Sequence, residues 1–209
     1  MKKIILSFTC FLIAFTAISQ ELEFGFKAGL SKGGFTYSNF TANTVKYSPT
    51  NENISTYNFG AYGRLKLWVI GLYVQPELMY NKRGSNVTLE TTTDKYIFSN
   101  TANYLEIPVL VGFKMLKTFR IYGGPNFQIM TKQKTDIPNA PKFASSDLTK
   151  KTTGIQLGLG LDLMKLRFDV KYDFNAGNMG TPFLYDGSGP SAKNTMLTFQ
   201  IGYKLFGVL

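Results

Sequence analysis

The sequence contains no histidine, and its single cysteine, Cys10, lies within the first 20 residues. Many hydrolases depend on a histidine as general base, so the usual Ser-His-Asp and Cys-His arrangements cannot form here. Beyond Cys10 the chain has no thiol for a disulfide or a cysteine-bound metal. We therefore expect a protein that is not an enzyme and that uses no metal or other cofactor.

Long apolar runs are also scarce, and the clearest one follows two lysines at the start of the chain and ends near Ala17 and Ser19. A basic start, a short apolar run and small residues at positions −3 and −1 of a cut are typical of a signal peptide. The run falls short of the about 20 residues that a membrane helix needs, which disfavours the alternative of an uncleaved anchor. We predict that residues 1–19 are a signal peptide, cut between Ser19 and Gln20, and that residues 20–209 form one domain.

The rest of the chain alternates between apolar residues and polar residues or glycine, a pattern of β-strands with one apolar face. For example, Leu157 and Leu159 alternate with Gln156 and Gly158. A tilted strand of about ten residues is long enough to cross a bilayer. Eight segments of roughly this length show the pattern, at residues 24–31, 57–67, 70–81, 104–114, 119–129, 155–162, 166–174 and 197–205.

The connections between these segments alternate in length. Three are very short, near residues 68–69, 116–117 and 164–165, and four are long and polar, near 37–54, 82–102, 131–152 and 177–194. Short turns on one side and long loops on the other are typical of outer-membrane barrels. We predict an all-β fold: an eight-stranded antiparallel up-and-down transmembrane β-barrel with short periplasmic turns and long extracellular loops. The alternative is a soluble, lipocalin-like barrel whose apolar face surrounds a ligand.

In the transmembrane barrel the polar face of every strand points into a narrow lumen. Buried charges need partners, so we expect the inward charges of both signs to pair in a structural network: Arg64, Glu77, Glu106, Arg120, Arg167 and Asp169. Asp169 and Asp173 could be read as a catalytic carboxylate pair. They are about 13 Å apart along one strand, however, and Lys171 lies between them. We therefore interpret them as part of the same structural network.

Two features outside the lumen indicate a membrane surface. Tyrosine and tryptophan near strand ends fit the aromatic belts at the two interfaces, and we assign Tyr57, Trp68, Tyr80 and Tyr172 to these belts. The net charge of +10 is spread without a run of like charges, which disfavours nucleic acid and fits anionic lipid headgroups. The connection at 131–152 is the most basic and suits lipopolysaccharide, through Lys132, Lys134, Lys142, Lys150 and Lys151.

Five segments share a distinctive order and spacing, namely FGFKAGLSKGGF at 24–35, YVQPELMYNKRG at 73–84, YLEIPVLVGFK at 104–114, IYGGPNFQIM at 121–130 and LRFDVKYDFNAGNMG at 166–180. In these segments the chain resembles the PorT-like outer-membrane barrel proteins of the Bacteroidetes type. Where the family pattern usually reads Gly-Leu-Asn, this chain has Gly29-Leu30-Ser31. The resemblance implies an outer-membrane location and an eight-stranded fold, and some relatives assist secretion or gliding.

Two classes of function remain open from the sequence. The first is a structural or interaction protein that contacts a protein partner, not identified by the sequence, through its surface loops, with an accessory role in secretion or envelope integrity. The second is a small-solute or lipid transporter or binding barrel, which needs a cavity or an opening in the wall. Pro108 and Pro125 each remove a ladder donor, and we expect a local bulge at each rather than an opening.

Overall fold

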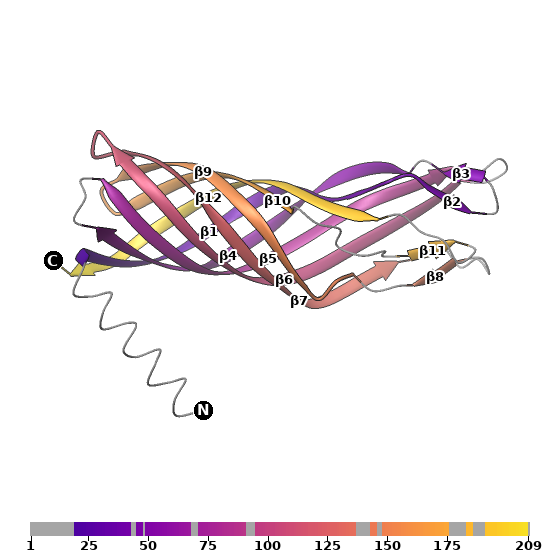
Figure 1. Ribbon diagram of the computed structural model, residues 1–209, viewed down its shortest axis with the longest axis horizontal. Coiled ribbons are helices and arrows are strands. Elements are labelled where there is room, and N and C mark those ends of the chain that lie inside the picture. Colours follow the sequence, from indigo (N-terminus) through magenta and orange to yellow (C-terminus); the bar gives the residue numbers. More distant parts are fainter. Residues whose placement is uncertain are drawn as a thin grey trace, which may run out of the picture.

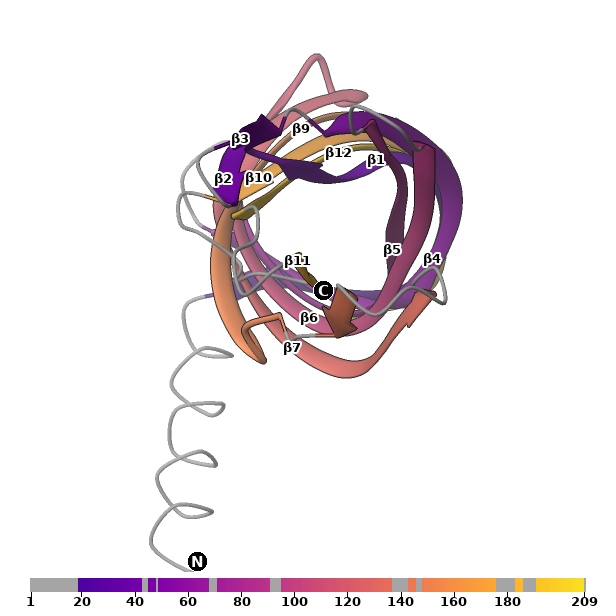
Figure 2. The same ribbon diagram turned by 90° about the vertical axis from the view of Figure 1, so that its right-hand side faces the viewer.

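The computed structural model describes residues 19–42, 45–47, 49–67, 71–90, 95–136, 143–145, 148–175, 183–185 and 191–208. Its main element is a closed antiparallel barrel of eight long strands (Figure 1). In order around the barrel these are β1 (Ser19–Tyr37), β12 (Ala192–Val208), β10 (Leu166–Asn175), β9 (Lys151–Leu163), β7 (Phe119–Asp136), β6 (Lys95–Met115), β5 (Leu72–Glu90) and β4 (Thr50–Leu67). The view along the barrel shows the closed ring (Figure 2). The predicted fold class is confirmed.

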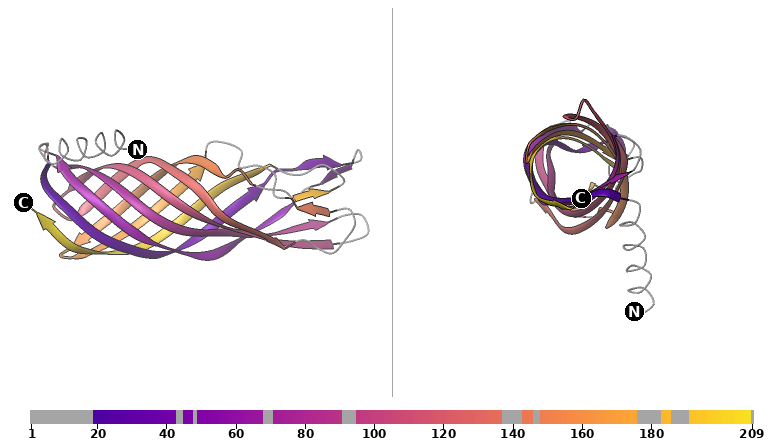
Figure 3. Two further views of the ribbon diagram at one scale, coloured as in Figure 1. Left: turned by 90° about the horizontal axis from the view of Figure 1, so that it is seen from below. Right: turned by 90° about the vertical axis from the view of Figure 1, so that its left-hand side faces the viewer.

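Among the described residues, two small two-stranded sheets stand at one end of the barrel, opposite the short turns (Figure 3). One pairs β2 (Phe40–Ala42) with β3 (Val45–Tyr47), and the other pairs β8 (Phe143–Ser145) with β11 (Phe183–Tyr185). The second of these sheets joins two of the predicted long connections, because β8 precedes β9 and β11 follows β10. We call this end extracellular, since outer-membrane barrels carry their long connections there.

The two short turns that the structure describes in full, at residues 116–118 and 164–165, reverse the chain without the Asn-Gly or Asp-Gly pairs that tight hairpins favour. Leu116, Lys117 and Met164 instead adopt left-handed backbone conformations, with φ of 50°, 60° and 52°. In the first of these turns the Thr118 N–H donates to the Met115 carbonyl at 3.1 Å. Ordinary residues thus occupy positions where glycine or asparagine is more common, which is why the sequence alone leaves the turn boundaries open.

Most apolar side chains of the strands lie on the outside of the barrel, as predicted, although some, such as Leu110, are buried inside it. Leu157 and Leu159 are 51% and 61% exposed, whereas Gln156 is 3% exposed and Gly158 is buried in the lumen. The soluble lipocalin-like alternative requires an apolar interior, and this arrangement contradicts it. Within the described residues, no helix is long and apolar enough to span a membrane.

The strands are longer than the sequence pattern predicts. They contain 10 to 21 residues, so that residues 82–90 and 95–102, predicted as part of a loop, belong to β5 and β6. On β6 the outward positions are apolar from Phe113 to Leu105 and then polar at Asn103 and Thr101. The apolar band therefore covers about ten residues of a strand, enough to cross the bilayer, and the strand continues as the wall of an extracellular extension.

Candidate functional site

The lumen of the barrel is filled with charged side chains. Among the residues that the structure describes, six carboxylates and six cations are buried there, namely Glu23, Glu77, Glu106, Asp162, Asp169 and Asp173 with Lys27, Arg64, Arg83, Arg120, Arg167 and Lys171. The equal numbers leave these twelve groups without net formal charge. A buried charge without a partner is strongly destabilising, so the barrel depends on how these groups pair.

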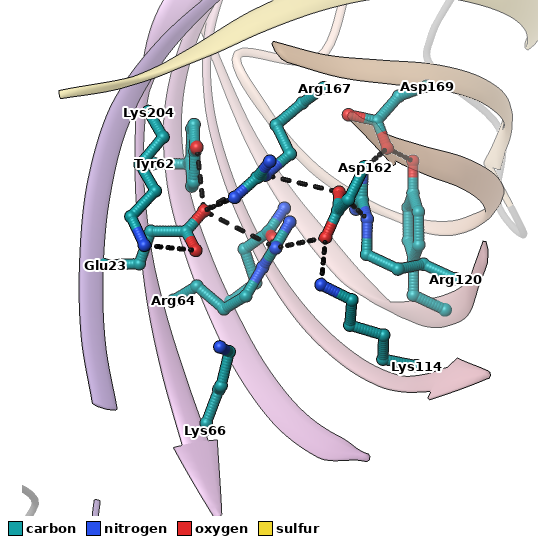
Figure 4. A network of polar contacts seen from close by, with 12 residues as sticks. Glu23, Tyr62, Arg64, Lys66, Lys114, Arg120, Asp162, Arg167, Asp169 and Lys204 are labelled. Carbon is teal, nitrogen blue, oxygen red and sulfur yellow. Dashed lines mark hydrogen bonds and ion pairs between the residues drawn. The ribbon is translucent and has the colours of Figure 1, made fainter. Parts of the chain in front are cut away.

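Asp162, on β9, gathers four cations at the short-turn end (Figure 4). Its Oδ1 lies 2.6 Å from Arg120 Nε and 3.2 Å from Arg167 Nε. Its Oδ2 lies 2.9 Å from Lys114 Nζ and 3.2 Å from Arg64 Nη1. The four cations come from β7, β10, β6 and β4, and the last two strands are not neighbours of β9 in the sheet. One carboxylate therefore ties strands together across the lumen.

Glu23, on β1, extends the same network. It lies 3.0 Å from Arg167 Nη2 and 3.5 Å from Arg64 Nη1, and it accepts a hydrogen bond of 3.0 Å from the Tyr62 hydroxyl. Arg64 and Arg167 thus each contact both Glu23 and Asp162. Figure 4 shows these two guanidinium groups lying between the two carboxylates.

Lys27 connects two carboxylates in the middle of the lumen. Its Nζ lies 2.8 Å from Glu77 Oε1 and 3.0 Å from Asp169 Oδ2. Lys171 approaches Glu77 at 2.6 Å, and Arg120 approaches Asp169 at 2.8 Å. Two cations therefore hold each of these carboxylates, and all five side chains are buried.

Asp173 belongs to a separate group nearer the extracellular end. It accepts hydrogen bonds from Asn126 Nδ2 at 3.0 Å and from Gln156 Nε2 at 2.8 Å. The same Asn126 amide donates to Glu106 at 2.9 Å, and Glu106 also accepts from Arg83 Nε at 2.9 Å. The two aspartates of β10 are thus held by different partners, which fits the structural interpretation of both.

Tyrosine rings and glycines alternate across neighbouring strands and fill the remaining space. Tyr73 pairs with Gly112, Gly112 with Tyr122, and Tyr122 with Gly158. A Cβ placed on Gly158 would overlap the Tyr122 ring, and one on Gly112 would overlap the Tyr73 ring. These inward glycines are needed because the rings lie directly over them.

At the extracellular end β1 approaches β5, the strand on the other side of its neighbour β4. Gly34 has a φ of 151°, and a Cβ there would overlap the carbonyl oxygen of Gly84 on β5, which is not a neighbour of β1 in the sheet. Just beyond, the Tyr37 hydroxyl accepts hydrogen bonds from Asn100 at 2.9 Å and Ser85 at 3.3 Å. The end of β1 therefore narrows the mouth of the barrel.

All six charges predicted for the lumen are buried and paired there, namely Arg64, Glu77, Glu106, Arg120, Arg167 and Asp169. Of the other six, the sequence-based prediction assigned Asp173 to the network and left out Lys27, Glu23, Arg83, Asp162 and Lys171. The alternation along the strands is enough to place four of these residues in the lumen, because they occupy inward positions: Lys27, Asp162, Lys171 and Asp173. Arg83 was placed in a loop, and Glu23 precedes the predicted first strand.

The structure describes three of the four residues predicted for the aromatic belts. Tyr57 and Tyr172 are 49% and 47% exposed on the outer wall. Tyr80 is half-buried against Phe59, with ring centroids 5.3 Å apart. Trp68 lies outside the described residues.

The basic segment at residues 131–152, predicted as a loop, lies partly within strands at both of its ends. Lys132 and Lys134 belong to the end of β7, Lys151 begins β9, and Lys150 directly precedes it. These four side chains are exposed, whereas Lys142 lies outside the described residues.

The prolines do not produce the expected bulges. The β6–β7 register is the same at Pro108–Asn126 and at the next recorded pair, Val111–Gly123. Pro125 likewise continues the β7–β9 register opposite Ile155. A missing N–H at each position is tolerated because the pairs on both sides keep the strands aligned.

Two hollows of about 560 and 670 Å³ lie on the outer wall. Both include Ala28 and Ile201 and are lined mainly by lipid-facing apolar side chains. They belong to the membrane-facing surface rather than to the lumen. No cluster of three or more potential metal-ligating side chains occurs among the residues that the structure describes.

A closed barrel with an apolar outer band, a charged interior and short turns at one end defines the class of outer-membrane β-barrel proteins. Residues 18–179 match the family model of the outer membrane protein beta-barrel domain, and the chain belongs to this family. Its location is therefore the outer membrane. No match was found among curated proteins.

Solved structures with a similar fold include the outer membrane protein OprG from Pseudomonas aeruginosa, with 14% identity and a TM-score of 0.59 over 90% of this chain and 97% of that chain. Neisserial surface protein A has 9% identity and a TM-score of 0.46 over 87% and 97%. Outer Membrane Protein W from E. coli has 15% identity and a TM-score of 0.43 over 88% and 97%. At this identity the OprG comparison supports the fold alone.

Proposed function

We propose that this protein is a non-enzymatic outer-membrane barrel with a filled lumen, and that it acts as an interaction protein through its extracellular extension. The observation that carries the proposal is the set of twelve buried, balanced charges in the lumen. A conducting or transporting barrel needs an open path along its axis, or side chains in the lumen that can move aside. Here the charged groups are held by one another and by glycine–tyrosine packing.

The same contacts support the absence of catalysis. A carboxylate that acts as general acid or base must reach a substrate proton. Asp169 and Glu77 each contact two cations at 3.0 Å or less, in a fully buried position. Such carboxylates serve to neutralise the neighbouring cations.

An accessory role in secretion or envelope integrity, as in some PorT-like proteins, is the finer form of this proposal. It is supported by the extracellular extension, where polar outward positions such as Asn103 and Thr101 continue above the apolar band. Rigid strands that project beyond a membrane can hold a protein partner in a fixed orientation. Photo-crosslinkers at Thr101, compared with the same probe at lipid-facing Ile121, test for such a partner in native outer membrane.

Single-channel recording in planar bilayers tests the filled lumen. We expect no stepwise conductance from the refolded protein, while an open porin in the same bilayers supplies the positive control. Reproducible ion-selective steps would contradict the proposal and favour the small-solute transporter. Flux of a labelled fatty acid into vesicles that contain the barrel provides the matching test of lipid transport.

A further inference from the structure

A β-bulge in β7 determines which way two lysines point. The β6–β7 pairing shifts by one residue between Tyr104–Met130 and Asn103–Lys132, which leaves Thr131 as the extra residue. Even-numbered residues of β7 face the lumen before the shift, so an unbroken strand would aim Lys132 inward. Bulges commonly re-aim a side chain in this way.

Beyond the bulge the parity of β7 is reversed. Thr135 now points inward and donates to the buried Asn100 at 3.1 Å. Lys132 and Lys134 are exposed on the outer wall, and the Lys134 side chain is 69% exposed. The bulge therefore moves two cations from the lumen to the outside.

The outward lysines gather on one side of the barrel at the edge of the apolar band. Lys82, Asn103 and Lys132 are paired side by side on β5, β6 and β7. Two strand spacings separate the two lysine backbones, which is about 10 Å. Lys151 pairs with Ile129, the last apolar outward residue of β7. We name this set, with Lys134 and Lys150, the basic patch: Lys82, Lys132, Lys134, Lys150 and Lys151.

The basic patch carries excess positive charge. Among the described side chains, its acidic contact is Asp136, which lies 3.2 Å from Lys134 and is itself 63% exposed. The residues between the lysines, such as Asn103 and Thr131, are uncharged. Lysine stems can lie along the apolar wall while the ammonium groups reach the headgroup layer.

We propose that the basic patch binds the phosphate groups of a phosphorylated glycolipid in the outer leaflet. Its position at the extracellular edge of the apolar band matches the depth of lipid headgroups, and ammonium groups are suitable partners for phosphate. The site deepens the interaction role proposed above by naming a lipid partner. It does not depend on the filled lumen, so the conductance test and the following test can fail independently.

The test measures lipid retention by native mass spectrometry of the detergent-purified barrel. The probes are bis-phosphorylated lipid A, its dephosphorylated counterpart and phosphatidylglycerol, with inorganic phosphate as competitor. The patch variant is Lys82→Gln with Lys132→Gln. The matched control is Lys32→Gln with Lys193→Gln, which removes two exposed lysines from β1 and β12 on the opposite side of the barrel.

We expect the patch variant to bind phosphorylated lipid A at least tenfold more weakly, while the control stays within about twofold of wild type. Equal losses in both variants would overturn the proposal in favour of diffuse surface charge. Equal retention of the dephosphorylated lipid or of phosphatidylglycerol would overturn the assignment to glycolipid phosphate, and so would full displacement by millimolar inorganic phosphate. If the double variant does not show the folded band on unboiled gels, Lys132→Gln alone is compared with Lys193→Gln.

Discussion

Replacing Asp162 with alanine tests whether the lumen network stabilises the barrel. The substitution removes a carboxylate that contacts four cations within 3.2 Å. Because the Asp162 side chain is only 3% exposed, water cannot replace it, and the four cations are left facing one another. Breaking a buried ion pair costs about 3–5 kcal/mol. Arg120 and Arg167 keep second carboxylates, Asp169 and Glu23, so we expect about 3 kcal/mol of lost unfolding free energy.

Asp136→Ala is the matched control, because this aspartate pairs with one lysine and its side chain is 63% exposed. An exposed pair contributes about 0–1 kcal/mol, so this variant should be close to wild type. Asp162→Asn keeps the shape but loses the charge, and it should fall between the two variants.

Unfolding of the barrel in lipid vesicles by guanidinium, followed by fluorescence of the single tryptophan, measures these differences. A gel shift between boiled and unboiled samples reports the folded fraction independently. If Asp162→Ala costs no more than Asp136→Ala, then the lumen charges are solvated rather than paired. The filled-lumen argument would then be wrong.

Three further predictions concern the wall, the packing and the processing of the chain. Leu159→Arg should reduce the free energy of folding into vesicles by about 2–4 kcal/mol, because it places a cation in lipid. Gln156→Lys, on the lumen side, should reduce it less. The reverse order would contradict the assignment of the faces. Gly158→Ala forces a methyl group against the Tyr122 ring and should lower the unfolding free energy of the barrel by at least about 1 kcal/mol. Gly63→Ala should have a smaller effect, because its Cβ would lie 3.4 Å from the nearest atom. Equal effects in the same unfolding assay would refute the packing argument. Mass spectrometry of protein purified from outer membrane should give a chain that starts at Gln20, and retention of residues 1–19 would disprove the cleaved signal peptide.

The faces of the strands could be predicted from the sequence because lipid imposes a simple rule. Outward residues in the bilayer must be apolar and inward residues need not be, so Leu157 and Leu159 separate from Gln156 and Gly158 by parity alone. The same rule places Arg64 and Arg120 in the lumen, where the structure has them. It also explains why the fold class and the number of strands follow from the pattern.

This alternation of apolar outward and polar inward residues is required only where the strand is in contact with lipid. Above the apolar band both faces of a strand can be polar, as at Asn100, Thr101 and Asn103, and the alternation that indicates a strand disappears. Arg83 therefore looks like a loop residue in the sequence, although it is buried and bonded to Glu106. The extended strands of the extracellular end are visible only in the structure.

The sequence by itself determined that this chain has an apolar outside and a charged inside, since both follow from local alternation. Only the tertiary structure decided which charges meet. Lys27 on β1 reaches Glu77 on β5, 50 residues away, because both strands pair with β4 and the β4 residue beside Lys27 is Gly60, which has no side chain to separate them. The bulge at Thr131 likewise sends Lys132 outward against the parity of its strand, because register between strands is a property of pairing and not of one segment.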